Sequence, residues 1–148
     1  MYFVNRDHIE NTLLYMSGLL ETYEQQSSAT FLEKLGIERL SQMVIESMVD
    51  VGNMMIDGFI MRDPGSYEDI IDILIDEKVI PQEDEQAYKD VIGLRKMLVR
   101  EYTNINHEQI EAILSKNVKT LEQFRPYVLD YLEKEMGPVT TFTKREES

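Results

Sequence analysis

The chain has 148 residues, no cysteine and a formal net charge of −13. A chain of this length buries about two-thirds of the surface that its unfolded form exposes, so one hydrophobic core suffices. The absence of cysteine excludes disulfides and thiolate metal sites and suits a cytoplasmic protein, and no segment approaches the roughly 20 apolar residues of a membrane span. The acidic charge disfavours broad binding of nucleic acid, so a nucleic-acid site requires a local basic patch.

Helical spacing of apolar residues predominates along the chain and predicts an all-α protein. Asn5 is the expected N-cap of a first helix, because its side chain can accept a backbone N–H of the first turn. After a polar link at residues 25–28, a second helix is predicted from Phe31 to about Phe59, and Asp63-Pro64-Gly65 stops it.

Ser66 is the expected cap of a short third helix, whose apolar run at residues 70–75 would also suit a strand. A fourth helix is predicted from about Pro81 to about Tyr102, with three acidic residues in its first turn. A fifth helix should begin directly after the cap residue Asn106.

Pro126 is expected to kink or divide the fifth helix, and Gly137-Pro138 to end the fold. Residues 1–137 are therefore predicted to form a single helical domain, followed by a flexible tail at residues 138–148. Long helices joined by short turns predict an antiparallel four-helix up-and-down bundle with one or two extra short helices.

The sequence Arg95-Lys-Met-Leu-Val-Arg100-Glu-Tyr102 lies at the end of the predicted fourth helix. It resembles the signature of the HepT-like family of the HEPN superfamily, which has an Arg, four residues, a His, one residue and a Tyr. Arg100 occupies the position of the histidine. The flanking segments 45–53, 63–67 and 93–94 resemble the same family in the same order.

The resemblance implies a toxin of a toxin-antitoxin system: a metal-independent endoribonuclease without a cofactor. It acts as a homodimer with sites at the subunit interface, and a nucleotidyltransferase-like antitoxin holds it in check. It also implies that Tyr102 carries the hydroxyl that the antitoxin modifies with nucleotide. The alternative for Tyr102 is an ordinary core tyrosine with a satisfied hydroxyl.

Arg95 and Arg100 are the candidate catalytic residues, and with Lys96 they make the densest basic patch of the chain. A guanidinium can pair with two phosphate oxygens, although Arg95 can equally form an ordinary ion pair with an acid of the second helix. Arg100 cannot act as a base because it stays protonated. Since a general base contributes about 10²–10⁴-fold to a rate, cleavage should be weakened or lost.

Positions 95 and 102 lie about 20° apart on an ideal helix, whereas position 100 lies about 140° from position 95. One helix face cannot hold all three side chains, so either the helix unwinds near Tyr102 or two subunits converge. His107 lies seven residues after Arg100, a long reach for a substitute base, so it is interpreted as an exposed residue in the first turn of its helix. His8 is interpreted in the same way.

A polar stripe on the second helix comprises Glu46, Asp50, Asn53 and Asp57. Three interpretations compete: pairing with Arg95 and Arg100 across the bundle, exposure to water, or binding of a hard divalent cation. The function accordingly has three alternatives, which are a weakened ribonuclease toxin, a non-catalytic dimeric scaffold that engages a nucleotidyltransferase, and a carboxylate-bound metal enzyme. A metal site is the least expected of these interpretations, because no histidine accompanies the stripe.

Overall fold

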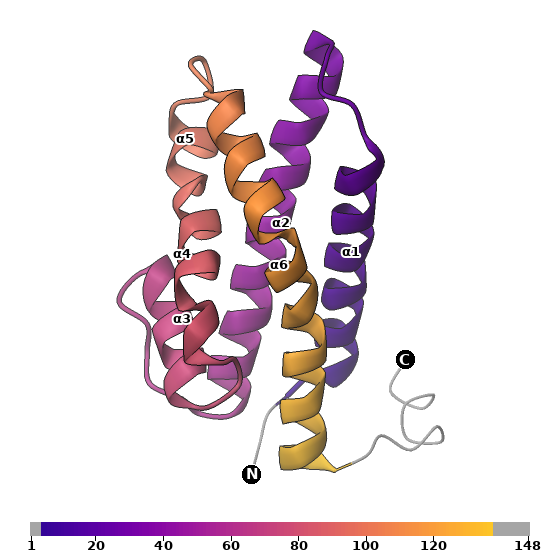
Figure 1. Cartoon of the computed structure of the whole chain (residues 1–148). Helices are drawn as coiled ribbons and strands as arrows, with labels where there is room; N and C mark the ends of the chain where they lie inside the picture. Colours follow the sequence, from indigo (N-terminus) through magenta and orange to yellow (C-terminus); the bar gives the residue numbers. More distant parts are fainter. Residues whose placement is uncertain (1–3, 138–148) are drawn as a thin grey trace.

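The computed structural model describes residues 4–137, which form six α-helices and one 3-10 turn. The bundle consists of α1 (Arg6–Gln25), α2 (Phe31–Gly58), α4 (Glu85–Gly93) continued by α5 (Arg95–Arg100), and α6 (His107–Met136). A short helix, α3 (Tyr67–Asp76), and the 3-10 turn η1 (Gln82–Asp84) connect α2 to α4. Figure 1 shows the four long segments running alternately up and down, which confirms the predicted bundle. The predicted tail lies outside the described residues.

Side-chain caps start the long helices. The Asn5 side chain accepts the N–H of His8, and the Asn106 side chain accepts the N–H of Gln109, as expected for N-caps. Thr30 begins α2 with a full capping box, in which the Glu33 side chain returns a bond to the Thr30 backbone. These bonds satisfy N–H groups that have no partner inside the helix, so the capping residues define where each helix begins.

One continuous apolar core lies between the helices, and the predicted stripes of α1 and α2 face it. Ile9, Leu13, Val44 and Met48 are almost completely buried. At the α4–α6 contact the rings of Tyr88 and Phe124 meet edge to face, with centroids 5.7 Å apart. The core thus fixes α4, and with it α5, against α2 and α6.

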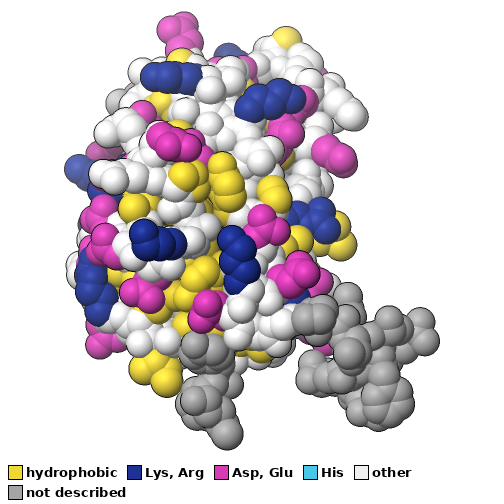
Figure 2. All heavy atoms as spheres, turned by 60° about the horizontal axis from the view of Figure 1, so that its bottom comes forward, with side chains coloured by type: hydrophobic (Ala, Val, Ile, Leu, Met, Phe, Trp, Pro, Cys, Tyr) yellow, Lys and Arg dark blue, Asp and Glu magenta, His cyan; other side chains and the backbone are white. Residues whose placement is uncertain are grey.

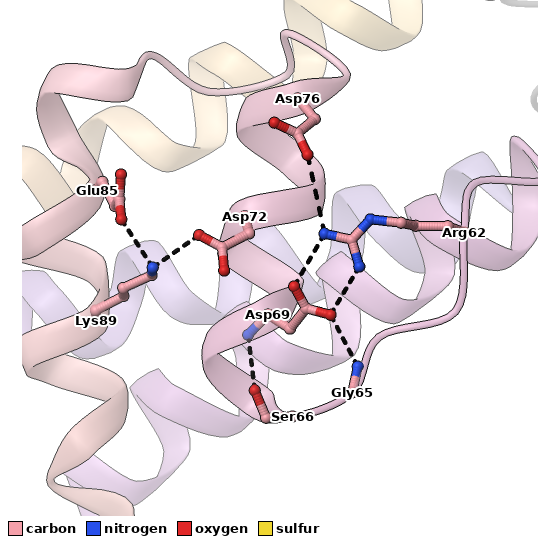
Figure 3. Close-up of polar contacts among 8 residues, drawn as sticks. All are labelled: Arg62, Gly65, Ser66, Asp69, Asp72, Asp76, Glu85 and Lys89. Atoms are coloured by element: carbon pink, nitrogen blue, oxygen red, sulfur yellow. Dashed lines mark hydrogen bonds and ion pairs between the residues drawn. The ribbon is translucent and has the colours of Figure 1, made fainter.

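A polar network holds the turn between α2 and α3 (Figure 3). Arg62 forms two hydrogen bonds with the Asp69 carboxylate, at 2.8 and 2.9 Å, and the N–H of Gly65 donates to the same group. These bonds lower the pKa of Asp69 to about 2, the Arg62 guanidinium having the largest effect. Because Ser66 caps α3 by accepting the Asp69 N–H, residues 67–76 form a helix rather than the alternative strand.

The predicted bounds of the fourth helix were wrong. The fourth helix does not run from Pro81 to Tyr102, because it starts with the turn η1, breaks at Leu94 and ends at Arg100. The Leu94 N–H bonds to the carbonyl of Val91, a three-residue step that interrupts the α-helical pattern. Of the two predicted effects of Pro126, division of the last helix is not found, because α6 is unbroken from His107 to Met136. Figure 1 shows α6 changing direction between its two halves, which agrees with a kink. None of the described helices combines the length and apolar character needed to cross a membrane.

Candidate functional site

The signature residues lie on α5 and on the turn that follows it. Arg95 is the first residue of α5, Arg100 is the last, and Tyr102 lies beyond the helix in the turn to α6. The helix therefore unwinds before Tyr102, which was one of the two predicted solutions to the angular spacing. Tyr102 is 67% exposed, so the interpretation as a core tyrosine is wrong.

Arg95 is held in place by two neighbouring elements. Its Nε donates to Glu46 Oε1 of α2 at 3.0 Å, and its Cζ lies 4.4 Å from the centre of the Tyr67 ring at the start of α3. The two Nη groups bond to no described residue and are not among the buried polar atoms without a partner. The expected ion pair with helix two exists, but it leaves both Nη groups open to solvent.

The other two cations of the basic patch are exposed. Lys96 reaches Glu101 only at 4.0 Å with both side chains largely in water, so this contact contributes little. Arg100 forms no ion pair or hydrogen bond with any residue of the range 4–137. Pairing of Arg100 with the α2 stripe, which we considered possible from the sequence, is therefore not found.

The polar stripe of α2 divides into residues with different surroundings. Glu46 pairs with Arg95, whereas Asp50 and Asp57 are exposed and Asn53 is partly exposed. Within residues 4–137 no group of three or more His, Asp or Glu side chains is placed to hold a metal ion. The stripe thus combines the pairing and the solvent interpretations, and its arrangement offers no support for a carboxylate-bound metal.

His107 is the functional candidate that sequence reasoning misjudged. It is 26% exposed rather than free in solvent, and its Nε2 lies 2.7 Å from Oε2 of Glu38, which is 20% exposed. Glu38 was missed altogether, although it precedes Glu46 by eight residues on α2, a spacing that returns toward the same side of a helix. His8, by contrast, is exposed in the first turn of α1, as expected.

The helical bundle places Arg95 and Tyr102 at the end of its third long segment, as the sequence resemblance predicted. The chain belongs to the ribonuclease HepT-like family, whose model matches residues 11–128. This result confirms the resemblance of the signature and its flanks.

Individual relatives agree with the family. The chain is 40% identical over 143 residues to YutE of Bacillus subtilis (strain 168), a candidate RNase, and the match covers 96% of this chain and 99% of YutE. The solved structure of YutE, described as a cytosolic protein of unknown function, has a TM-score of 0.92 over 95% of this chain and 99% of that chain.

A more distant solved structure shares the fold. It is a tri-AMPylated HEPN toxin of Shewanella oneidensis in complex with an MNT antitoxin, 19% identical with a TM-score of 0.70. The match covers 83% of this chain and 95% of the toxin. At this identity the likeness concerns the arrangement of the helices.

Proposed function

We propose that this protein binds RNA at the end of α5 and cleaves it without a metal, at a rate well below that of relatives with the signature histidine. The arrangement of Arg95 supports this proposal most directly. Glu46 accepts a hydrogen bond from its Nε, and the Tyr67 ring stacks against the guanidinium. Both Nη groups are left available to bind phosphate. A planar guanidinium oriented in this way presents two parallel donors to a phosphate, the geometry that recognises an RNA backbone.

The chemistry requires a base to take the proton of a ribose 2′-hydroxyl while its oxygen attacks the neighbouring phosphate. Cations must also stabilise the charge that builds on the phosphoryl oxygens. Arg95 and Arg100 supply the cations, and Arg100 cannot supply the base because its proton does not leave near neutral pH. The expected rate is therefore lower by about 10²–10⁴-fold than that of a site with the histidine.

The assembly proposed for this protein is a cytoplasmic homodimer that binds a nucleotidyltransferase-like antitoxin. The Shewanella toxin, which shares the fold and binds an MNT antitoxin, supports such a partner. The 67% exposure of Tyr102 supports a hydroxyl that a partner enzyme can reach for modification. The cytosolic description of YutE supports the location.

A second candidate function is a non-catalytic scaffold that keeps the dimer and the antitoxin surface. The observation that favours it is Arg100 itself, a permanently charged group in the position where proton transfer is needed. Under this function the arginines bind RNA or a protein partner and no bond is broken.

Restoring the histidine separates the two functions. We expect Arg100→His to raise cleavage of a single-stranded RNA by about 10²-fold or more in EDTA, because a titratable base returns to the site. Arg95→Ala should abolish the gain, whereas Arg125→Ala, in the second half of α6, should leave it intact. If the parent protein cuts RNA and Arg95→Ala leaves the rate unchanged, the site is wrongly assigned. If neither the parent nor Arg100→His cuts RNA, the scaffold function is favoured.

A further inference from the structure

The His107–Glu38 pair combines a proton-transfer group with a group that orients it. An ionised carboxylate only accepts hydrogen bonds, so the 2.7 Å contact requires the Nε2 of His107 to donate to Glu38. The lone pair of the neutral ring then resides on Nδ1. Nδ1 bonds to no described residue and is not among the buried polar atoms without a partner, so it is open to solvent.

The turn after α5 folds back and brings Asn106, the residue before His107, against α5. The N–H of Asn106 contacts Sδ of Met97, in the middle of α5, at 3.3 Å, and the N–H of Asn104 bonds to the carbonyl of Glu101. His107 follows Asn106 directly as the first residue of α6. The six residues between Arg100 and His107 therefore form a turn that returns to α5 before α6 begins.

The two α2 residues that bond to His107 and Arg95 show how far apart these groups are anchored along α2. Glu38 holds His107 and Glu46 holds Arg95, and eight residues at about 1.5 Å per residue separate these anchors by about 12 Å along the helix. Arg100 is exposed at the end of α5, and Figure 1 shows the α5–α6 turn and the beginning of α2 at the same end of the bundle. A single RNA strand, with a phosphate at each nucleotide, can follow such a row of groups.

We infer that His107, oriented by Glu38, is the group that receives the proton in this chain, in place of the histidine that Arg100 has replaced. This inference rests on the proposed RNA cleavage and names the residue that takes the proton in the absence of the signature histidine. The proton of the 2′-hydroxyl passes to Nδ1 as the 2′-oxygen bonds to phosphorus. The bond from phosphorus to the 5′-oxygen breaks, and that oxygen takes a proton from water. The products are a 2′,3′-cyclic phosphate and a 5′-hydroxyl end, and the ring returns its proton to solvent.

Glu38 acts as a positioning residue, because it touches the imidazole and not the RNA. Among the described residues it is the one titratable side chain that bonds to His107. Lys96, Arg100 and Glu101 are the charged groups on the adjoining end of α5 and the following turn, and none of them bonds to the ring. The orientation and the tautomer of His107 therefore depend on Glu38.

The test measures cleavage of a single-stranded RNA oligonucleotide in EDTA, with affinity measured separately on the 2′-O-methyl form, which cannot react. His107→Gln should lower the cleavage rate by about 10²-fold or more and change RNA affinity by less than about 2-fold. Glu38→Gln, which keeps the histidine, should lower the rate by about 10-fold or more. His8→Gln is the matched control, since His8 is exposed on α1, and should leave the rate unchanged.

A double variant distinguishes proton transfer from a structural role. In an Arg100→His background the restored histidine supplies the base, so His107→Gln should then have a much smaller effect than in the parent. If His107 has only a structural role, His107→Gln should lower the cleavage rate by the same factor in both backgrounds. That result would overturn the inference. If circular dichroism shows that His107→Gln does not fold, the cleavage rate of Glu38→Gln is used instead. A Glu38→Gln rate equal to that of the parent would overturn the inference.

Two further outcomes separate this inference from the proposed function. If the parent cuts RNA and the folded His107→Gln variant cuts it equally fast, the ribonuclease stands and His107 is not its base. If the parent binds the 2′-O-methyl RNA through Arg95 but never cuts unmodified RNA, the inference is overturned, while RNA binding at α5 remains.

Discussion

At the scale of single residues, the difference between a guanidinium and an imidazole decides what this site can do. Both bind phosphate when charged, but only the imidazole releases its proton near neutral pH. Arg95 is suited to binding phosphate, because Glu46 and Tyr67 fix its position while its Nη groups remain accessible to solvent. Arg100 adds charge without adding a base, so any proton transfer has to come from another residue.

Among the described glycines, Gly52 of α2 has the least room for a side chain, because α3 packs directly against it. A Cβ at this position would overlap the Cγ2 of Ile70, so the side chain of Ile70 or the helix that carries it would have to shift. We expect Gly52→Ala to lower the free energy of unfolding by about 1–3 kcal/mol, measured by urea denaturation. The same change should loosen α3, which carries Tyr67 against Arg95.

Gly36 is the matched control on the same helix, because it is exposed and nothing lies within 4 Å of its Cβ position. Gly36→Ala should raise the free energy of unfolding by up to about 1 kcal/mol, since alanine has the higher helix propensity. Equal effects of the two substitutions would show that α3 does not pack on Gly52 as described.

At the scale of elements, the position of α3 depends on the polar turn that joins it to α2. Arg62 lies after the end of α2 and reaches Asp69 in the first turn of α3, while Lys89 of α4 bridges to Asp72 of α3 at 2.7 Å (Figure 3). These pairs are partly exposed to solvent, so each contributes modestly. Together they attach α3 at both sides and keep Tyr67 beside Arg95.

The Arg62–Asp69 pair should make stability depend on pH in acid. Asp69 has a pKa of about 2 in the folded protein against an ordinary value of 3.8. Because the folded value is the lower one, the contribution is complete above about pH 4 and is lost as the pH falls toward 2. The stability difference between the wild type and Asp69→Asn should therefore shrink between pH 4 and pH 2 in urea denaturation. Asp63→Asn, in the same turn, should differ little from the wild type at either pH, and a constant difference for Asp69→Asn would contradict the pairing.

At the scale of the whole molecule, charge limits where RNA can bind. The chain has 28 acidic and 15 basic residues, so its average field repels a polyanion. Figure 2 shows the lower end of the bundle, on which Asp and Glu side chains are interspersed with Lys and Arg around exposed hydrophobic ones. No single basic patch appears on that face.

The proposed assembly makes Tyr102 the accessible target of a nucleotidyltransferase partner. We expect Tyr102→Phe to abolish transfer of nucleotide by the cognate antitoxin with ATP, measured by intact mass spectrometry, because the acceptor hydroxyl is gone. Tyr15→Phe is the control, since Tyr15 is also exposed, at 52%, but lies in α1. Light scattering of the unmodified protein should give the mass of two chains. Modification that persists in Tyr102→Phe, or a mass of one chain, would contradict the assembly.

The sequence by itself determined the class of fold and most helix boundaries. Caps and apolar stripes are local patterns, and the Asn5, Ser66 and Asn106 caps formed as predicted. The error in the fourth helix concerned local backbone, a three-residue step at Leu94. The signature also indicated the family, because it consists of residue types at fixed spacings along the chain and does not depend on the fold.

Only the tertiary structure decided which charges meet. Arg95 and Glu46 are 49 positions apart, and His107 and Glu38 are 69 apart, so no local spacing pairs them. Their contacts arise because α2 packs beside α5 and the start of α6, and because the turn after Arg100 folds back toward Met97. Burial of the apolar stripes sets those helix positions, and the polar groups at the helix edges then pair with whichever partners the packing brings within reach.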